Sequence, residues 1–126
     1  NEEGNDLKVA ITSMGQNMDS KVDPRFGRAK WFIVVDTETN QHQVFSNEQN
    51  LNASQGAGIQ AAENISRQGV QAVITGNCGP KAFKTLETAG IQIYCGADGT
   101  AAEVLEKFKN GKIKKADNAN VEGHWV

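Results

Sequence analysis

The fold is decided by the stretch Val70-Gln71-Ala72-Val73-Ile74-Thr75-Gly76-Asn77-Cys78-Gly79-Pro80-Lys81-Ala82-Phe83. An apolar run rich in β-branched residues ends at a Gly-Asn-Cys-Gly turn, and Pro80 then opens an amphipathic segment. This order is typical of a buried strand that passes through a tight turn into a helix, because proline favours the first helical position. The N–H groups of the turn and the positive end of the helix dipole predict a binding place for an anion.

The size and composition of the chain fit one compact domain of 126 residues that buries a core without disulfides. The net charge of -2, from 13 basic and 15 acidic side chains, gives no general attraction to nucleic acid. The two cysteines, Cys78 and Cys95, are too few for a disulfide framework and indicate a reducing compartment. No apolar run reaches the roughly 20 residues of a membrane helix. We therefore expect a cytoplasmic protein that does not contact membranes.

Alternating and helical apolar spacings predict the other elements of a single α/β domain. Three helices are expected at residues 59–68, 80–89 and 100–108, and five strands at residues 7–12, 31–36, 43–46, 70–75 and 91–94. The last helix begins with a predicted capping box, in which the Thr100 side chain accepts from the Glu103 backbone N–H and the Glu103 side chain accepts from the Thr100 backbone N–H. Right-handed crossovers then give a mixed five-stranded sheet with helices on both faces. We expect a polar lead at residues 1–6, the domain at 7–114 and a loosely ordered tail at 115–126.

A long polar segment, residues 13–28, follows the first strand and has no apolar period, so we expect a loop. In an open α/β sheet the turns after neighbouring parallel strands meet at one edge, where such sheets bind ligands. The loop would bring Arg25 and Arg28 to that edge. Lys81 adds a cation in the first turn of a helix, where it does not favour the helix dipole. A bound anion accounts for these cations, and solvated surface charges are the alternative.

The two cysteines allow more than one interpretation. Cys78 precedes a helix N-terminus, where the pKa of a thiol tends to fall, and Cys95 follows the next strand, so both could offer thiolates to a soft metal. The alternatives are that Cys95 is a small buried hydrophobic residue and that Cys78 is a small residue at a tight turn. A catalytic cysteine needs a base, but His42 falls in a hairpin turn and His124 in the tail.

Several enzyme classes are disfavoured by the motifs. Residues 56–61 match the dinucleotide pattern G-x-G-x-x-A, but a polar loop separates them from the preceding strand and no acidic residue ends the following one. A phosphate-binding G-K-[ST] loop, a nucleophile elbow and a paired-histidine zinc site are all missing from the sequence. The first strand carries no carboxylate for a metal-dependent nuclease. We therefore expect a binding protein and not an enzyme, with no nucleotide bound.

The sequence resembles the dinitrogenase iron-molybdenum cofactor biosynthesis family, which includes NifX-like proteins, the NifX-like portion of NifB and the small orange proteins. The matching pieces run in family order from about Leu7 to Lys114 and include Arg25-Phe26-Gly27-Arg28-Ala29, Asn47, Gly56-Ala57-Gly58-Ile59, Val73-Ile74-Thr75-Gly76, Gly79-Pro80 and Gly99-Thr100. The resemblance implies a ribonuclease-H-like three-layer fold without nuclease activity. It also implies that the protein holds or delivers a metal–sulfur cluster.

Such clusters are anionic, so glycine-turn amides, a helix N-terminus and cationic side chains suit them physically. On this basis the expected cluster-binding residues are Arg25, Phe26, Gly27, Arg28, Asn47, Gly56, Gly58, Gly76, Asn77, Cys78, Gly79, Pro80 and Lys81. The expected cargo is an iron–sulfur or molybdenum-containing cluster, and the expected partner is a cluster-assembly or acceptor protein. We expect a monomer or a weak homodimer.

The chain departs from many nitrogenase-associated members at one position, because Arg25 stands where they carry a histidine before Phe-Gly. An arginine can hold cluster charge but does not coordinate metal. This departure favours a stand-alone member of the family, in which Cys78 would be the replacement metal ligand. The alternative function is a regulatory or interaction module that binds a protein partner or a small anion on the same fold.

Overall fold

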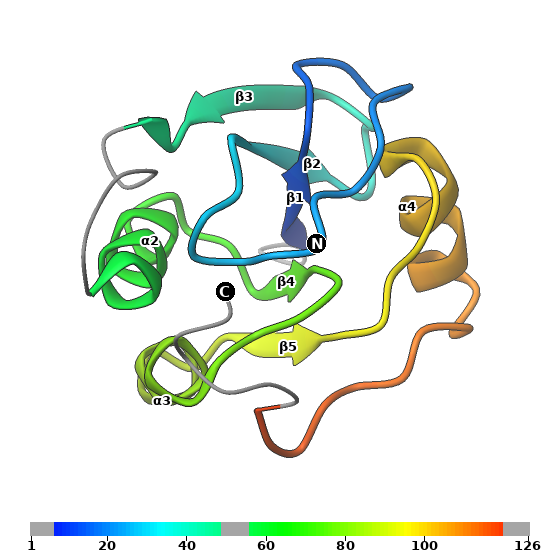
Figure 1. Ribbon diagram of the computed structural model, residues 1–126. Helices are drawn as coiled ribbons and strands as arrows, with labels where there is room; N and C mark the ends of the chain where they lie inside the picture. The colour runs from blue at the N-terminus through cyan, green and yellow to red at the C-terminus, as the bar shows by residue number, and fades with distance from the viewer. Residues whose placement is uncertain (1–6, 49–55, 120–126) are drawn as a thin grey trace.

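The computed structural model describes residues 7–48 and 56–119, which form a mixed five-stranded sheet (Figure 1). The strands are β1 (Lys8–Ser13), β2 (Trp31–Asp36), β3 (His42–Ser46), β4 (Ala72–Ile74) and β5 (Gln92–Tyr94), in the spatial order β3-β2-β1-β4-β5. β2 is antiparallel to β1 and β3, whereas β4 is parallel to β1 and β5. The predicted single-domain α/β class and the parallel pairing of the last two strands are confirmed.

Helices cover both faces of this sheet, as the apolar patterns predicted. Figure 1 shows α2 (Ala57–Ser66) and α3 (Pro80–Thr88) on one side and α4 (Ala101–Lys109) on the other. The central strands alternate their side chains between two cores, so that Ala10 and Val73 face α2 and α3 while Ile11 and Ile74 face α4. None of the described helices is long and apolar enough to cross a bilayer.

The capping box predicted for the last helix is present. The Thr100 hydroxyl accepts a hydrogen bond from the Glu103 backbone N–H at 3.1 Å, and the Glu103 carboxylate accepts one from the Thr100 N–H at 2.8 Å. These hydrogen bonds hold the pKa of Glu103 below its usual value. The Ala101 N–H donates to the Ser20 carbonyl and the Ala102 N–H to the Met18 carbonyl, both at 2.9 Å, so all four N–H groups at the start of α4 are satisfied within the chain.

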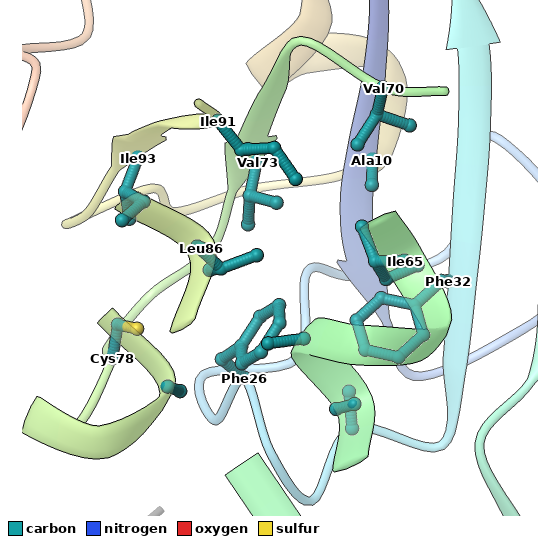
Figure 2. Close-up of a cluster of buried hydrophobic side chains, with 14 of the residues drawn as sticks. Ala10, Phe26, Phe32, Ile65, Val70, Val73, Cys78, Leu86, Ile91 and Ile93 are labelled. Carbon is teal, nitrogen blue, oxygen red and sulfur yellow. The ribbon is translucent and has the colours of Figure 1, made fainter. Parts of the chain in front are cut away.

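The segment after β1 is more ordered than the loop that the sequence led us to expect. Ser13 pairs with Val22, Lys21 with Thr100 and Arg25 with Asn77 in isolated bridges. Phe26 is fully buried, and its ring centroid lies 5.5 Å from that of Phe32 (Figure 2). The segment folds across the strand ends because this aromatic ring completes the core under α2 and α3.

The start of the expected tail is attached to the edge strand β5. Lys115 pairs with Tyr94, and the Ala116 N–H donates a hydrogen bond of 2.8 Å to the Ile93 carbonyl. Ala116 and Ala119 also pack against the core of α2 and α3. The remainder of the expected tail, residues 120–126, lies outside the described residues, as does the polar lead at residues 1–6.

Candidate functional site

The three helices all begin at the same edge of the sheet. β1, β3, β4 and β5 run in one direction, and α2, α3 and α4 follow β3, β4 and β5 in the chain, so each helix starts where a strand ends. α2 and α3 start side by side, since a Cβ atom on Gly58 would lie 3.0 Å from the Cβ atom of Ala82. Only a glycine at residue 58 fits this approach without a shift, and it places two positive helix ends together.

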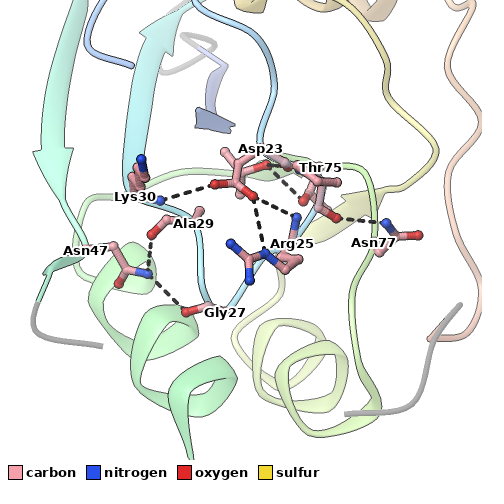
Figure 3. A network of polar contacts seen from close by, with 10 residues as sticks. Asp23, Arg25, Gly27, Ala29, Lys30, Asn47, Thr75 and Asn77 are labelled. Atoms are coloured by element: carbon pink, nitrogen blue, oxygen red, sulfur yellow. Dashed lines mark hydrogen bonds and ion pairs between the residues drawn. The ribbon is translucent and has the colours of Figure 1, made fainter. Parts of the chain in front are cut away.

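The loop that carries Arg25 is fastened to this edge by a polar network (Figure 3). The Asn77 side-chain amide donates to the Pro24 carbonyl at 2.8 Å, and the Phe26 N–H donates to the Asn77 carbonyl at 3.1 Å. The Thr12 hydroxyl donates to the Asp23 carbonyl at 2.8 Å. The first strand, the turn after β4 and the loop therefore form one connected unit.

Asp23 and Asn47 hold the loop from inside, because both side chains are almost completely buried. The Asp23 carboxylate accepts hydrogen bonds from the Arg25 N–H at 3.0 Å and the Lys30 N–H at 3.4 Å. The Asn47 amide donates to the Gly27 carbonyl at 3.0 Å and to the Ala29 carbonyl at 2.8 Å (Figure 3). Asn47 thus acts as a support for the loop, and its side-chain amide is turned inward.

Cations line the outer side of the same edge. The Arg25 side chain is 43% exposed, and its Nε atom lies 3.8 Å from Asp23 Oδ1, so the loop carboxylate orients the guanidinium. Lys81 is exposed in the first turn of α3, and Arg28 is half-buried. The predicted meeting of Arg25 with the turn after β4 is confirmed by the Arg25–Asn77 bridge.

The two helices at this edge differ from α4 at their first turns. Gly56 is the N-cap of α2 and Gly79 is the N-cap of α3, and neither helix has a side-chain cap or an acidic residue in its first turn among the described residues. α4 has both. The N-cap side chains therefore do not satisfy the first N–H groups of α2 and α3, a position where water or an anion can accept.

The surroundings of Cys78 do not favour the thiolate form that the sequence led us to expect, although Cys78 does precede a helix. Its side chain is fully buried and packs with Phe26 and Leu86 in the core (Figure 2). Burial, and to a smaller extent the neighbouring Cys95, raises the pKa of the Cys78 thiol from 9.0 to about 12. The prediction of a lowered pKa is wrong because loss of hydration outweighs the helix dipole here.

Cys95 is the more accessible of the two thiols, so its expected role as a buried hydrophobic residue is only half correct. It is half-buried and packs against the core of α2 and α3. Burial raises the pKa of Cys95, and a hydrogen bond from the Cys78 backbone N–H partly opposes this rise. Within residues 7–48 and 56–119, no group of three or more His, Cys, Asp or Glu side chains is placed to hold a metal ion.

Several of the expected site residues thus have structural roles. Phe26, Gly27 and Cys78 are buried, and Gly76 is a glycine because a Cβ atom there would lie 2.7 Å from Pro24 Cα. Pro80 and Lys81 are exposed at the start of α3, beside Gly79. Asp23, which holds the loop from inside, was not among the expected site residues. Its sole local signal was its place before Pro24, a pair typical of turns.

The fold and this edge define a small α/β domain with cationic side chains and two helix N-termini at its strand ends. Residues 7–111 match the family described as dinitrogenase iron-molybdenum cofactor, and the chain belongs to this family. An uncharacterized protein of Methanocaldococcus jannaschii is 30% identical over 113 residues, which are 86% of this chain and 95% of that protein.

Two solved structures resemble the chain over nearly all of their length. The apo form of the orange protein from Desulfovibrio gigas is 35% identical with a TM-score of 0.90, covering 94% of this chain and 100% of that one. A putative NifB protein from Thermotoga, assigned to the DUF35 family, is 33% identical with a TM-score of 0.81, covering 93% and 99% of the two chains. The resemblance to this family that the sequence motifs indicated is confirmed.

Proposed function

We propose that the protein binds an anionic iron–sulfur or molybdenum-containing metal–sulfur cluster at the shared edge of α2 and α3, and carries it without catalysing a reaction. The observation that carries the proposal is the pairing of two helix N-termini, without side-chain caps among the described residues, beside Arg25 and Lys81. Backbone N–H groups, aligned helix dipoles and cations all favour a negatively charged ligand. Family membership supports a metal–sulfur cargo among the anions that such an edge would hold.

The cluster would be held mainly by hydrogen bonds and charge in this proposal. Arg25 has no metal-coordinating atom, and the Cys78 thiol would have to lose a proton inside the core to become a ligand. We therefore assign Cys78 to the packing of the turn. Cys95 is the thiol that a cargo at this edge would reach more easily, since it is only half-buried.

Three further properties belong to the same proposal. A carrier needs a partner, so we infer a cluster-assembly or acceptor protein that exchanges the cargo. Two free thiols favour the reducing, cytoplasmic compartment expected from the sequence. The ribonuclease-H-like relationship implied by the motifs remains a prediction.

The test is anaerobic reconstitution of the purified protein with ferrous iron, molybdate and sulfide, followed by desalting, absorption spectroscopy and metal analysis. We expect a chromophore that stays with the protein. The double variant Arg25→Ala/Lys81→Ala should retain much less of it. The matched control Arg67→Ala/Lys114→Ala removes the same two charge types away from this edge and should retain as much as the wild type. A wild-type protein that is colourless and metal-free after desalting would contradict the proposal.

A regulatory module that binds a small oxyanion is the second candidate, because N–H groups at a helix start accept phosphate as readily as a cluster. Titration with inorganic phosphate in the absence of metal, followed by NMR, separates the two. Shifts confined to Gly56–Gly58 and Gly79–Lys81 at micromolar phosphate, together with failed reconstitution, would favour this second function.

A further inference from the structure

A second surface, on the opposite face of the sheet, has the properties of a protein-docking groove. The groove has a volume of about 570 Å³, and its apolar floor is made by Leu7, Tyr94, Phe108 and Ile113. These four side chains are partly buried against the core under α4 and leave the rest of their surface to the groove. The rings of Tyr94 and Phe108 meet edge to face with centroids 5.0 Å apart, which fixes the middle of the floor.

The segment that borders this floor is rich in lysine, and two of its lysines line the groove. Residues 107–115 contain five of the 13 basic residues of the chain and no acidic residue, although the net charge of the protein is -2. Lys109 and Lys115 line the groove itself, and the Lys109 ammonium donates a hydrogen bond to Asn40 Oδ1 at 2.5 Å. Lys112, Lys114 and Lys115 are exposed, and none of them forms an ion pair with another described residue.

Only some of the five lysines at residues 107–115 are explained by a stabilising effect on α4. Lys107 and Lys109 lie in the last turn of the helix, where cations interact favourably with the helix dipole. Lys112, Lys114 and Lys115 follow the end of the helix, and the dipole effect fades within one turn. Of the last three lysines, Lys115 lines the groove, and Lys112 and Lys114 flank the floor residue Ile113 in the chain, although none of them serves the helix. Cations beside an apolar floor are the pattern of a charged rim around a hydrophobic interface core.

We propose that this groove binds an acidic, amphipathic segment of a partner protein. One or two large apolar side chains of the segment would cover Tyr94, Phe108 and Ile113, and its carboxylates would face the lysines. Charge complementarity selects an acidic partner, and the overall negative charge of the chain disfavours nucleic acid as the occupant.

Most of the groove lies toward the opposite strand ends from the candidate site, and only Tyr94, the last residue of β5, is near the site edge. Leu7 immediately precedes β1 and Phe108 lies near the end of α4, whereas the site lies where β1 ends and the helices begin. A partner in the groove would leave that edge uncovered. The proposal does not depend on the identity of the cargo, so either proposal can fail without the other.

The test uses the full chain and a short fluorescein-labelled peptide of glutamates with one leucine and one phenylalanine, measured by fluorescence anisotropy. We expect saturable binding that Lys112→Glu/Lys115→Glu weakens by about tenfold or more. The control Lys30→Glu/Lys84→Glu makes the same charge change on exposed lysines outside the groove and should weaken binding much less. Far-UV circular dichroism checks that both variants fold.

Three further outcomes overturn the proposal. An all-glutamate peptide that binds equally well would mean that the floor contributes nothing. An oligothymidine strand that displaces the peptide at lower concentration would point to nucleic acid. Binding that needs removal of residues 1–6, which hold Glu2, Glu3 and Asp6, would make the acidic start of the chain the occupant.

Discussion

A Cβ atom on Gly76 would lie 2.7 Å from the Cα atom of Pro24 and 3.0 Å from its carbonyl oxygen. The backbone of Gly76 is not in the left-handed region, so contact with the loop, and not conformation, excludes a side chain there. Both crowded atoms belong to the backbone and cannot move alone. We expect Gly76→Ala to push the loop away from the turn after β4 and to cost about 1–3 kcal/mol of unfolding free energy.

The measurement for Gly76→Ala is urea unfolding combined with limited trypsin digestion, which reads the loop through cleavage after Arg25 and Arg28. Gly90→Ala is the control, since Gly90 has a φ of 80° and no neighbour within 4 Å of the added Cβ atom. The control should cost about 1 kcal/mol through backbone strain alone. If trypsin cuts the loop equally fast in both variants, the close contact does not hold the loop.

The second prediction concerns Asn47→Asp, which keeps the size of the side chain and removes its two donors. The Gly27 and Ala29 carbonyls would then face a carboxylate oxygen instead of an amide N–H. Buried carbonyls without partners are costly, so we expect a loss of about 2–4 kcal/mol of unfolding free energy. Thermal and urea unfolding measure it.

Asn64→Asp is the matched control for this substitution. The side chain of Asn64 is half-buried on α2, and its Oδ1 atom accepts a hydrogen bond from Arg67 at 2.8 Å. A carboxylate accepts that bond at least as well, so the control should be close to neutral. Equal losses in the two variants would contradict the assigned role of Asn47.

The elements of the fold could be predicted because their signals are local. Apolar alternation marks β1 and β2, and Pro80 and the pair Thr100 and Glu103 mark two helix starts. Parallel pairing of β4 with β5 follows from the handedness of the crossover through α3. Each of these rules uses residues that are close in the chain or a constraint that all α/β sheets share.

The interior of the site could not be predicted because its contacts join distant segments. The Thr12 and Thr75 hydroxyls lie 2.9 Å apart and are separated by 63 residues in the chain. Each hydroxyl has one proton to donate. Because the Thr12 hydroxyl donates its proton to the Asp23 carbonyl, it accepts the hydrogen bond from the Thr75 hydroxyl. No local pattern marks such a pair, and burial of Cys78 likewise depends on tertiary packing that reverses the local helix effect.

The third prediction concerns the alkaline pH dependence of stability. The pKa of the Cys78 thiol rises from 9.0 to about 12 on folding, so the folded chain keeps a proton that the unfolded chain loses in this range. The stability contribution is complete below pH 9 and is lost as the pH rises towards 12, with a slope of about 1.4 kcal/mol per pH unit from this group.

Urea unfolding of Cys78→Ala at a series of pH values between about 8 and 10.5 tests this slope. We expect stability to fall less steeply with pH than in the wild type, whatever the loss at pH 8. Cys95→Ala is the comparison, because burial also raises the pKa of Cys95 but the Cys78 N–H opposes that rise. A larger flattening in Cys95→Ala than in Cys78→Ala would show that the wrong thiol has been assigned to the core.

The last prediction links the approach of α2 and α3 to anion binding. Gly58→Ala gains up to about 1 kcal/mol of helix propensity but adds a methyl group 3.0 Å from Ala82 Cβ, so the two helix starts must separate. Ala82→Gly loses a similar propensity and a buried methyl group. The double variant Gly58→Ala/Ala82→Gly moves one methyl group across the same gap, so its propensity terms cancel. We expect it to be more stable than the sum of the single changes by about 1 kcal/mol.

After anaerobic reconstitution, Gly58→Ala should retain less chromophore than the double variant, because only the single variant separates the two helix ends. Additive stabilities would mean that the gap between the helices adapts freely, and equal retention would remove the paired helix N-termini from the binding site.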